Sequence, residues 1–415
     1  MYNFRIYLYL KLYVFFKSLF LNEKKLNEKI NKNINEITKK KFFIVTSRLR
    51  TGFFLLLKYL KQVKPKKNEI LFQTYNLPSM VQIAYKLGFK LKFYNLDKNS
   101  GEILISDIKK KISKKTLCII VSNIFNSEKS LIILKKICKK KKILLIEDNA
   151  IYYDNYYYNS NQKKIFAGSF GDYSLFSFNI MKHISAFYGG GVATNDYNFK
   201  TFAENKIKKY KSFPKTLFIK QVLIFFILKI FLIKIFYKNI YMPFLIKAYK
   251  KIGNSFFLKL VYPSLNFKKN KFDESYFSKI TLISKKVIYL QLLDRKNRVE
   301  NYFLRKKNNF YYYKYLSKIN HPHFSVLKLS NFNFQNYLEF PIFAKNKEML
   351  NRYLLSKGIE CKYINYMDCE KIYLKNKKKE NFFSKYCLGL PSHQKIQKNY
   401  IMYIVKNINE FYKKR

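Results

Sequence analysis

The chain has 415 residues, and its 82 Lys and Arg against 25 Asp and Glu give a formal net charge of +57. Its hydrophobic fraction of 48% excludes a disordered chain and allows a large core in about two or three domains. The basic residues are scattered along the whole chain, so we attribute the charge to a biased composition and predict no nucleic-acid site. The excess charge still favours anionic ligands by long-range attraction.

The cysteines and histidines give no motif for a metal or a disulfide. The cysteines are widely spaced, without zinc-like or redox-motif spacing, which predicts reduced thiols: Cys118, Cys138, Cys361, Cys369 and Cys387. His321 and His323 flank a proline but lack a nearby acidic or thiol ligand, so we expect a loop there and no metal site.

Residues 1–41 are predicted to form an N-terminal helical segment. Met1 to Leu21 is apolar and aromatic but is interrupted by Arg5, Lys11 and Lys17, and it has no small-residue cleavage site. It is therefore neither a clean signal peptide nor an apolar span of about 18 residues. Two interpretations remain, a helix on a membrane surface and a helix packed on the domain, and we favour packing.

Between Phe42 and Lys141 the apolar runs alternate with helical patterns. We predict strands and helices in this order: a strand, a turn at 46–52 and a helix within Phe42–Lys61, a strand at Glu69–Phe72, a helix within Tyr75–Lys86, a strand within Leu87–Asp97, a helix at Leu104–Ile112, a strand at Thr116–Ser122 and a helix at Ser130–Lys141. Unbroken apolar strands alternating with helices are typical of a mostly parallel sheet covered on both faces.

The most informative stretch carries one acid and one lysine at the ends of neighbouring strands. An apolar strand from Ile143 ends at Asp148, and a second strand, Tyr173 to Phe178, leads into a turn that carries Lys182. Ligands of α/β proteins bind at the carboxyl ends of the strands. A lysine can form a Schiff base with an aldehyde cofactor, and a carboxylate can keep a pyridinium nitrogen protonated.

The same stretch resembles the nucleotide-sugar aminotransferases of the DegT/StrS type, which are fold-type-I enzymes that use pyridoxal phosphate (PLP). The resemblance lies in the Glu-Asp pair, Gly168-Ser-Phe-Gly-Asp172, Phe176-Ser-Phe178, Lys182, the glycines from Gly189 and the final Thr-Asn-Asp196. Such a composite match is more specific than a lone glycine motif. It implies an α/β fold with a large PLP-binding domain and a smaller C-terminal α+β domain.

The resemblance also implies site residues. Lys182 and Asp148 would be catalytic, as the Schiff-base lysine and the partner of the ring nitrogen. The other residues implied to bind the cofactor are Arg50, Thr51 and Gly52 at a phosphate-binding helix start, Tyr75 or Leu77 over the ring, Asn123 near it, and Ser177 at the phosphate. The residues at 50–52 also fit an ordinary helix start, and Tyr75 and Leu77 both remain candidates. The glycines from Gly189 would let the backbone pass close to the cofactor.

The remaining segments complete the expected domains: residues 42–275 form the large domain and 276–415 a linking helix and the small domain. Residues 213–250 are almost wholly apolar and dotted with lysines, which fits either a membrane-surface hairpin or an insertion packed on the domain or at a dimer interface. Ile280–Leu316 is predicted as one long helix, Leu338–Phe343 as a strand, Lys347–Lys357 as a helix, Ile359–Cys361 as a strand start and Ile396–Tyr412 as the closing helix.

The resemblance predicts an aminotransferase that moves an amino group from glutamate to a nucleotide-linked keto-sugar, for surface polysaccharide or lipopolysaccharide synthesis. A cytoplasmic homodimer with peripheral membrane contact is the expected setting. Leu49 and Ile151 stand where the family has other residues, and the family's asparagine is missing from Phe277–Ile280, so a degenerate, non-catalytic relative is one alternative. The other is a membrane-surface binding protein without a cofactor.

Overall fold

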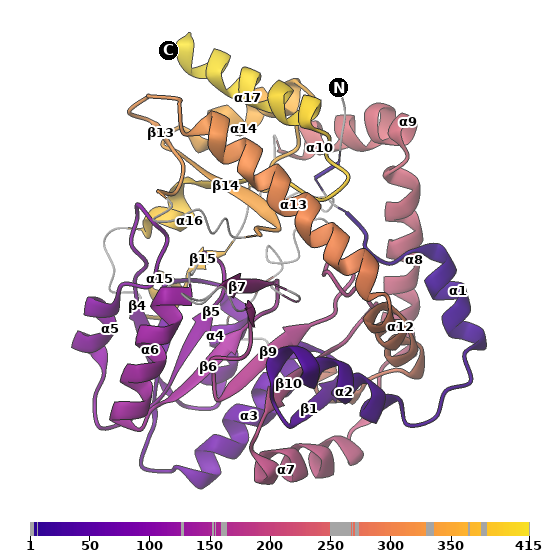
Figure 1. The fold of residues 1–415 in the computed structure, drawn as a ribbon, viewed down its shortest axis with the longest axis vertical. Helices are drawn as coiled ribbons and strands as arrows, with labels where there is room; N and C mark the ends of the chain where they lie inside the picture. The colour runs from indigo at the N-terminus through magenta and orange to yellow at the C-terminus, as the bar shows by residue number, and fades with distance from the viewer. Residues whose placement is uncertain are drawn as a thin grey trace.

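A computed structural model of the chain describes residues 4–5, 7–125, 128–151, 153, 155–158, 164–249, 267, 269, 274–328, 336–363, 366–374 and 380–414. Its centre is a seven-stranded sheet with the order β1-β10-β9-β6-β5-β2-β4 (Figure 1). The strands span Phe42–Thr46 (β1), Gly190–Thr194 (β10), Tyr173–Ser177 (β9), Leu144–Asp148 (β6), Thr116–Ser122 (β5), Glu69–Gln73 (β2) and Lys90–Tyr94 (β4). Only β10 runs against its neighbours, which confirms the predicted mostly parallel sheet.

Helices cover both faces of the sheet, as the unbroken apolar strands require. One core cluster packs one sheet face against α3 (Leu49–Val63), α4 (Pro78–Lys86) and α7 (Tyr197–Lys208). A second cluster packs the opposite face against α5 (Ile105–Lys111) and α6 (Glu128–Lys141). Successive residues of β2 alternate between them, with Ile70 and Phe72 in the first cluster and Leu71 in the second.

The C-terminal part adds a three-stranded antiparallel sheet of β13 (Phe324–Ser325), β14 (Glu339–Ala344) and β16 (Cys387–Pro391). Helices α14 (Lys347–Ser356), α15 (Cys369–Leu374), α16 (Phe382–Tyr386) and α17 (Lys398–Lys413) accompany it. The segment from Ile359, where a strand was predicted to start, forms single bridges at Ile359 and at Lys362, the latter to Gly389, and does not form a continuous strand. Short pairs join β3 (Tyr75–Asn76) to β15 (Met367–Asp368), β7 (Tyr156–Tyr158) to β8 (Lys164–Phe166), and β11 (Lys211–Ser212) to β12 (Ser278–Lys279), which follows the 3-10 helix η3 (Glu274–Phe277).

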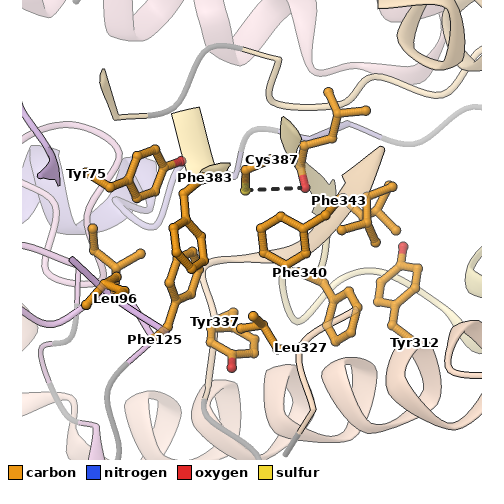
Figure 2. Close-up of a cluster of buried hydrophobic side chains, with 14 of the residues drawn as sticks. Tyr75, Leu96, Phe125, Tyr312, Leu327, Tyr337, Phe340, Phe343, Phe383 and Cys387 are labelled. Carbon is orange, nitrogen blue, oxygen red and sulfur yellow. Dashed lines mark hydrogen bonds between the residues drawn. The ribbon is translucent and has the colours of Figure 1, made fainter. Parts of the chain in front are cut away.

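An aromatic cluster joins the two halves of the chain (Figure 2). The Tyr75 ring stacks on Phe125 at a centroid distance of 6.2 Å, and Phe125 stacks on Phe383 of α16 at 5.4 Å. Phe343 of β14 lies edge-on to Phe383 at 5.6 Å. The central sheet and the C-terminal sheet therefore share one continuous core.

The predicted long linking helix is two helices, so that prediction was wrong. They are α12 (Leu282–Leu293) and α13 (Arg295–Leu316), and the break falls at Asp294, whose ψ of 58° is not helical. The Asp294 carboxylate accepts hydrogen bonds from the Asn297 amide at 2.7 Å, and the Arg298 guanidinium donates to the Gln291 and Leu292 carbonyls that end α12. Polar side chains thus satisfy the broken helix end, as capping requires.

The insertion at 213–250 is helical and consists of α8 (Lys215–Phe231), α9 (Lys234–Phe236), the π-helix η1 (Tyr237–Tyr241) and α10 (Met242–Tyr249). Its inner side packs into a third core cluster through Phe225, Leu228 and Tyr241. Among the described residues no single helix has the length and apolarity of a membrane span. The helical segments Lys215–Phe231 and Lys234–Tyr249 are long and apolar enough only when taken together, and the chain bends by 86° between them.

The N-terminal segment is packed on the protein, as favoured, through α1 (Leu12–Phe20) and α2 (Leu26–Thr38). Before α1 the chain passes into the interior, and Arg5 forms ion pairs with Glu360 at 3.1 Å and Glu339 at 3.4 Å. Tyr237 and Tyr241 of the insertion donate their hydroxyls to the same Glu360 carboxylate. One buried carboxylate thus holds together the N-terminus, the insertion and the C-terminal part.

We expect Arg5→Met to lower the free energy of unfolding by about 3–5 kcal/mol, because it removes a main cationic partner of a buried carboxylate. The measurement is thermal and urea denaturation against the exposed control Lys17→Met. A loss no larger than that of the control would show that the Arg5 ion pairs contribute nothing to stability.

Candidate active site

Strand direction brings the predicted residues to one edge of the central sheet. Ser122 of β5 pairs with Asp148 of β6, and Asp148 pairs with Leu175 of β9, so these parallel strands end together. Ser177 ends β9 and pairs with Gly190 at the start of the antiparallel β10, and Gly190 pairs in turn with Thr46 at the end of β1. Helix α3 begins three residues after β1, so its N-terminus lies at the same edge.

Lys182 lies in a well-anchored turn after β9. Its backbone N–H donates to the Asn179 carbonyl at 2.9 Å. Three residues further on, the Gln291 side chain of α12 accepts from the Ser185 N–H at 3.1 Å and donates to the Ser185 carbonyl at 2.8 Å. These reciprocal bonds tie the lysine turn to α12, a contact between residues 106 positions apart.

Asp148 and Lys182 are close enough to perturb each other electrostatically. Burial raises the pKa of Asp148 to about 6, and the hydrogen bond from the Ala150 N–H and the charge of Lys182 oppose that rise. Burial lowers the pKa of Lys182 to about 8, Lys362 lowers it further, and Asp148 opposes this shift. A carboxylate and an amine with pKa values displaced toward neutrality are typical of acid–base chemistry.

The helix start at 50–52 lies within the first turn of α3 and not before it. The Arg50 guanidinium donates to the Ser79 hydroxyl at 2.9 Å, and its charge contributes to lowering the pKa of Lys182. The Thr51 hydroxyl donates to the Tyr276 carbonyl at 2.8 Å and is buried. A Cβ on Gly52 would lie 2.7 Å from the Val192 side chain, so glycine lets α3 pack closely on β10. Arg50 is thus the residue of this turn whose charge reaches the site.

The glycines after Lys182 are fixed by close contacts within the protein. A Cβ at Gly190 would lie 2.3 Å from the Leu49 backbone nitrogen, so only glycine lets β10 pass the N-terminus of α3. Gly189 has a φ of 155°, and its Cβ would collide with Ile288 at 2.8 Å. The partly exposed Ser177 faces this crossing from the end of β9.

The three remaining predicted residues lie at different depths. Tyr75 is buried, stacks on Phe125 and lines a cavity with Lys362 and Tyr366. Leu77 precedes α4 and packs against the core between the central sheet and helices α3, α4 and α7. The buried Asn123 amide donates to the Asn149 side chain at 2.5 Å and to the Glu147 carboxylate at 3.3 Å, so it braces the residues on either side of Asp148.

The fold also brings in three residues that the motifs did not indicate. Lys362 pairs with Glu339 at 3.3 Å, and both charges act on Lys182. Burial raises the pKa of Tyr366, and Asp148 and Glu339 raise it further. All three line a partly open pocket that Ile151 also borders. They follow Lys182 by at least 157 positions, and no local motif marks them, so only the fold could place them here.

No group of three or more His, Cys, Asp or Glu among the described residues could hold a metal ion. His321 and His323 lie with ring centroids 5.4 Å apart beside β13, and all five cysteines are buried.

We expect the reactivity of the Lys182 amine to rise with pH through about 8, because the neutral form is the nucleophile. At pH 7 the lowered pKa leaves about 300 times more neutral amine than an ordinary lysine would have. The measurement is the rate at which PLP attaches to the cofactor-free protein as the pH is raised from about 6 to about 10.

Lys362→Met should move the midpoint of that profile upward, because the charge of Lys362 lowers the pKa of Lys182. The lowered pKa would be contradicted if the wild-type rate profile had its midpoint near the pKa of free lysine and Lys362→Met did not move it.

Known proteins share this fold. A sequence model of the DegT/DnrJ/EryC1/StrS aminotransferase family matches residues 14–212. Helicobacter pylori PseC, an aminotransferase of pseudoaminic acid biosynthesis, superposes with a TM-score of 0.70 at 15% identity, over 97% of this chain and 96% of that chain. The sugar aminotransferase CalS13 from Micromonospora echinospora also has a TM-score of 0.70, at 12% identity over 98% of each chain.

A third solved relative is the E. coli GDP-4-keto-6-deoxy-D-mannose-3-dehydratase with bound hydrated PLP. It has a TM-score of 0.67 at 18% identity, over 96% of each chain. A search of curated protein sequences finds no significant match.

The seven-stranded sheet, the small antiparallel sheet and the lysine and aspartate at one strand edge define a fold-type-I aminotransferase architecture. Residues 14–212 of the chain match the DegT/DnrJ/EryC1/StrS aminotransferase family, a family that uses PLP.

Proposed function

We propose that this aminotransferase transfers an amino group from glutamate to a nucleotide-linked keto-sugar, in the biosynthesis of surface polysaccharide or lipopolysaccharide. The observation that carries the proposal is that Lys182 and Asp148 lie at one edge of the sheet and interact electrostatically, and that Lys362 and Glu339, which line a pocket, also act on Lys182. Solved relatives support the two substrates: DesI has been crystallised with its TDP-sugar product, and a GDP-4-keto-6-deoxymannose-3-dehydratase with a trapped PLP-glutamate geminal diamine.

The residues at this edge fit PLP chemically. They supply an amine of lowered pKa, a buried carboxylate, an arginine and the N-terminus of a 15-residue helix, which favours a phosphate through its dipole. We propose that Arg50, Thr51, Gly52 and Ser177 hold the phosphate, and that Tyr75 or Leu77, with Asn123, lies near the ring. PLP, when bound, supplies an electrophilic carbonyl carbon and a ring that accepts electrons.

The protein side of the mechanism follows from the two pKa shifts. The Lys182 amine would hold the cofactor, and after displacement by the amino donor it would carry a proton from the donor carbon to the former carbonyl carbon of the cofactor. A pKa of about 8 leaves this amine able to act in both directions near neutral pH. The Asp148 carboxylate would keep the ring nitrogen protonated, and its burial strengthens that interaction.

Two features of the setting belong to the same proposal. We infer a cytoplasmic enzyme, because five buried and widely spaced cysteines suit a reducing compartment. We also infer a homodimer, which sedimentation velocity of the purified protein tests directly.

The experiment that tests the function is the absorbance spectrum of the purified protein with added PLP and then with glutamate. A visible band that shifts on adding glutamate supports transamination. A protein that develops no band with PLP would instead be the non-catalytic relative, an outcome consistent with the apolar Ile151 at the cavity.

A further inference from the structure

Two helices on one side of the molecule expose a continuous apolar stripe. On α8 the exposed residues Ile219, Leu223, Ile227 and Ile230 recur every three or four positions, so they lie along one face of the helix. On α1 the exposed residues are Leu12, Tyr13, Phe16, Leu19 and Phe20, and Phe20 is 86% exposed. Large apolar side chains on monomeric surfaces are usually scattered, so a double stripe of this kind indicates an interaction surface.

The two helices pack side by side (Figure 1), and we call their exposed apolar residues together the α1–α8 face. The Phe15 ring of α1 contacts Phe226 of α8 at 5.7 Å, and Phe15 and Phe225 both contact Phe187. Lys229 of α8 donates to the Leu8 carbonyl just before α1. These contacts fix the helices to the body of the protein while their outer residues stay exposed.

The charge of this face has one sign. The sequence contains no Asp or Glu from residue 1 to 22 or from 205 to 272, whereas both stretches contain lysines. Lys17, Lys215, Lys220 and Lys234 are exposed next to the apolar stripe. Basic side chains that flank apolar ones in helices are typical of segments that lie in the interface of an anionic membrane.

We propose that the α1–α8 face docks this enzyme on the surface of an anionic lipid bilayer. The helices lie on the bilayer and do not cross it, because the inner side of α8 is buried in the protein core and the chain bends by 86° after it. The exposed isoleucines and leucines enter the acyl boundary, and the lysines pair with lipid phosphates while their methylene stems stay in the apolar layer.

Charge argues against a second copy of this chain as the occupant. A symmetric contact between two α1–α8 faces would place lysines against lysines, and these stretches of the sequence hold no acidic residue to pair with them. Anionic phospholipids supply the complementary charge and the apolar layer together.

The absence of tryptophan from the chain makes a sharp experiment available. Ile227→Trp places a single fluorophore on the stripe, and Val63→Trp places one at an exposed position at the end of α3. With vesicles of phosphatidylcholine and phosphatidylglycerol we expect a blue shift, and quenching by brominated lipid, only for Ile227→Trp. Vesicles of phosphatidylcholine alone should produce neither effect, because they lack the anionic charge.

A charge-matched pair of variants separates docking from general attraction of a basic protein. Leu223→Glu/Ile227→Glu should reduce cosedimentation with the anionic vesicles about tenfold or more, through loss of two inserted side chains. Val63→Glu/Met349→Glu makes the same charge change at exposed positions elsewhere and should bind as the wild type does.

Three results would overturn the proposal: equal losses in the two double variants, no blue shift at Ile227→Trp, or conversion of an oligomer to a monomer by Leu223→Glu/Ile227→Glu without lipid. The last result would assign the face to a second copy. Circular dichroism of each variant checks that the fold is retained.

Discussion

Lys182→Ala should abolish covalent attachment of PLP and reduce transaminase turnover by about 10³-fold or more, because no other amine replaces both nucleophile and proton carrier. The wild-type protein, treated with PLP and then borohydride, should carry the reduced adduct on Lys182 in the peptide mass spectrum. The Lys182→Ala protein should show neither the adduct nor the visible absorbance band.

The matched control is Lys141→Ala, an exposed lysine at the end of α6, which should keep full labelling and turnover. This control matters in a chain with 82 basic residues, because PLP reacts slowly with many accessible lysines. Full turnover in Lys182→Ala, or labelling spread equally over other lysines in the wild type, would refute the assignment of Lys182.

Asp148→Asn should leave PLP attached but lower turnover by about 10²- to 10³-fold, because a neutral amide cannot keep the ring nitrogen protonated. The separation of attachment from turnover distinguishes this role from a structural one. The side chain keeps its size, and the hydrogen bond from the Ala150 N–H has an oxygen to accept it. Turnover and the spectrum of the bound cofactor are measured on the same sample.

The comparison for Asp148→Asn is Glu204→Gln, an exposed acid on α7 that should have no effect on either readout. If Asp148→Asn keeps wild-type turnover, the carboxylate does not act on the ring nitrogen. If the variant loses PLP and thermal stability together, Asp148 supports the fold more than the chemistry.

Much of this architecture could be predicted from local sequence. The alternation of apolar runs and helical patterns predicted the parallel sheet, and β5 lies where the pattern placed it, at Thr116–Ser122. Local patterns fail at element ends and breaks, where distant side chains decide. The turn predicted at 46–52 overlaps α3, which already begins at Leu49, and the break at Asp294 depends on the side-chain bonds of Asn297 and Arg298.

The sequence by itself determined the family resemblance, the strand ends that carry Asp148 and Ser177, and the turn that carries Lys182. These features depend on residues close together in the chain, where hydrophobic periodicity and short motifs can be recognised. Only the tertiary structure decided that the charges of Lys362 and Glu339 act on that lysine, that Tyr366 lines the same pocket as these two residues, and that Arg5 is buried against Glu360. The physical reason is that burial and charge pairing join residues hundreds of positions apart, and no local pattern records such contacts.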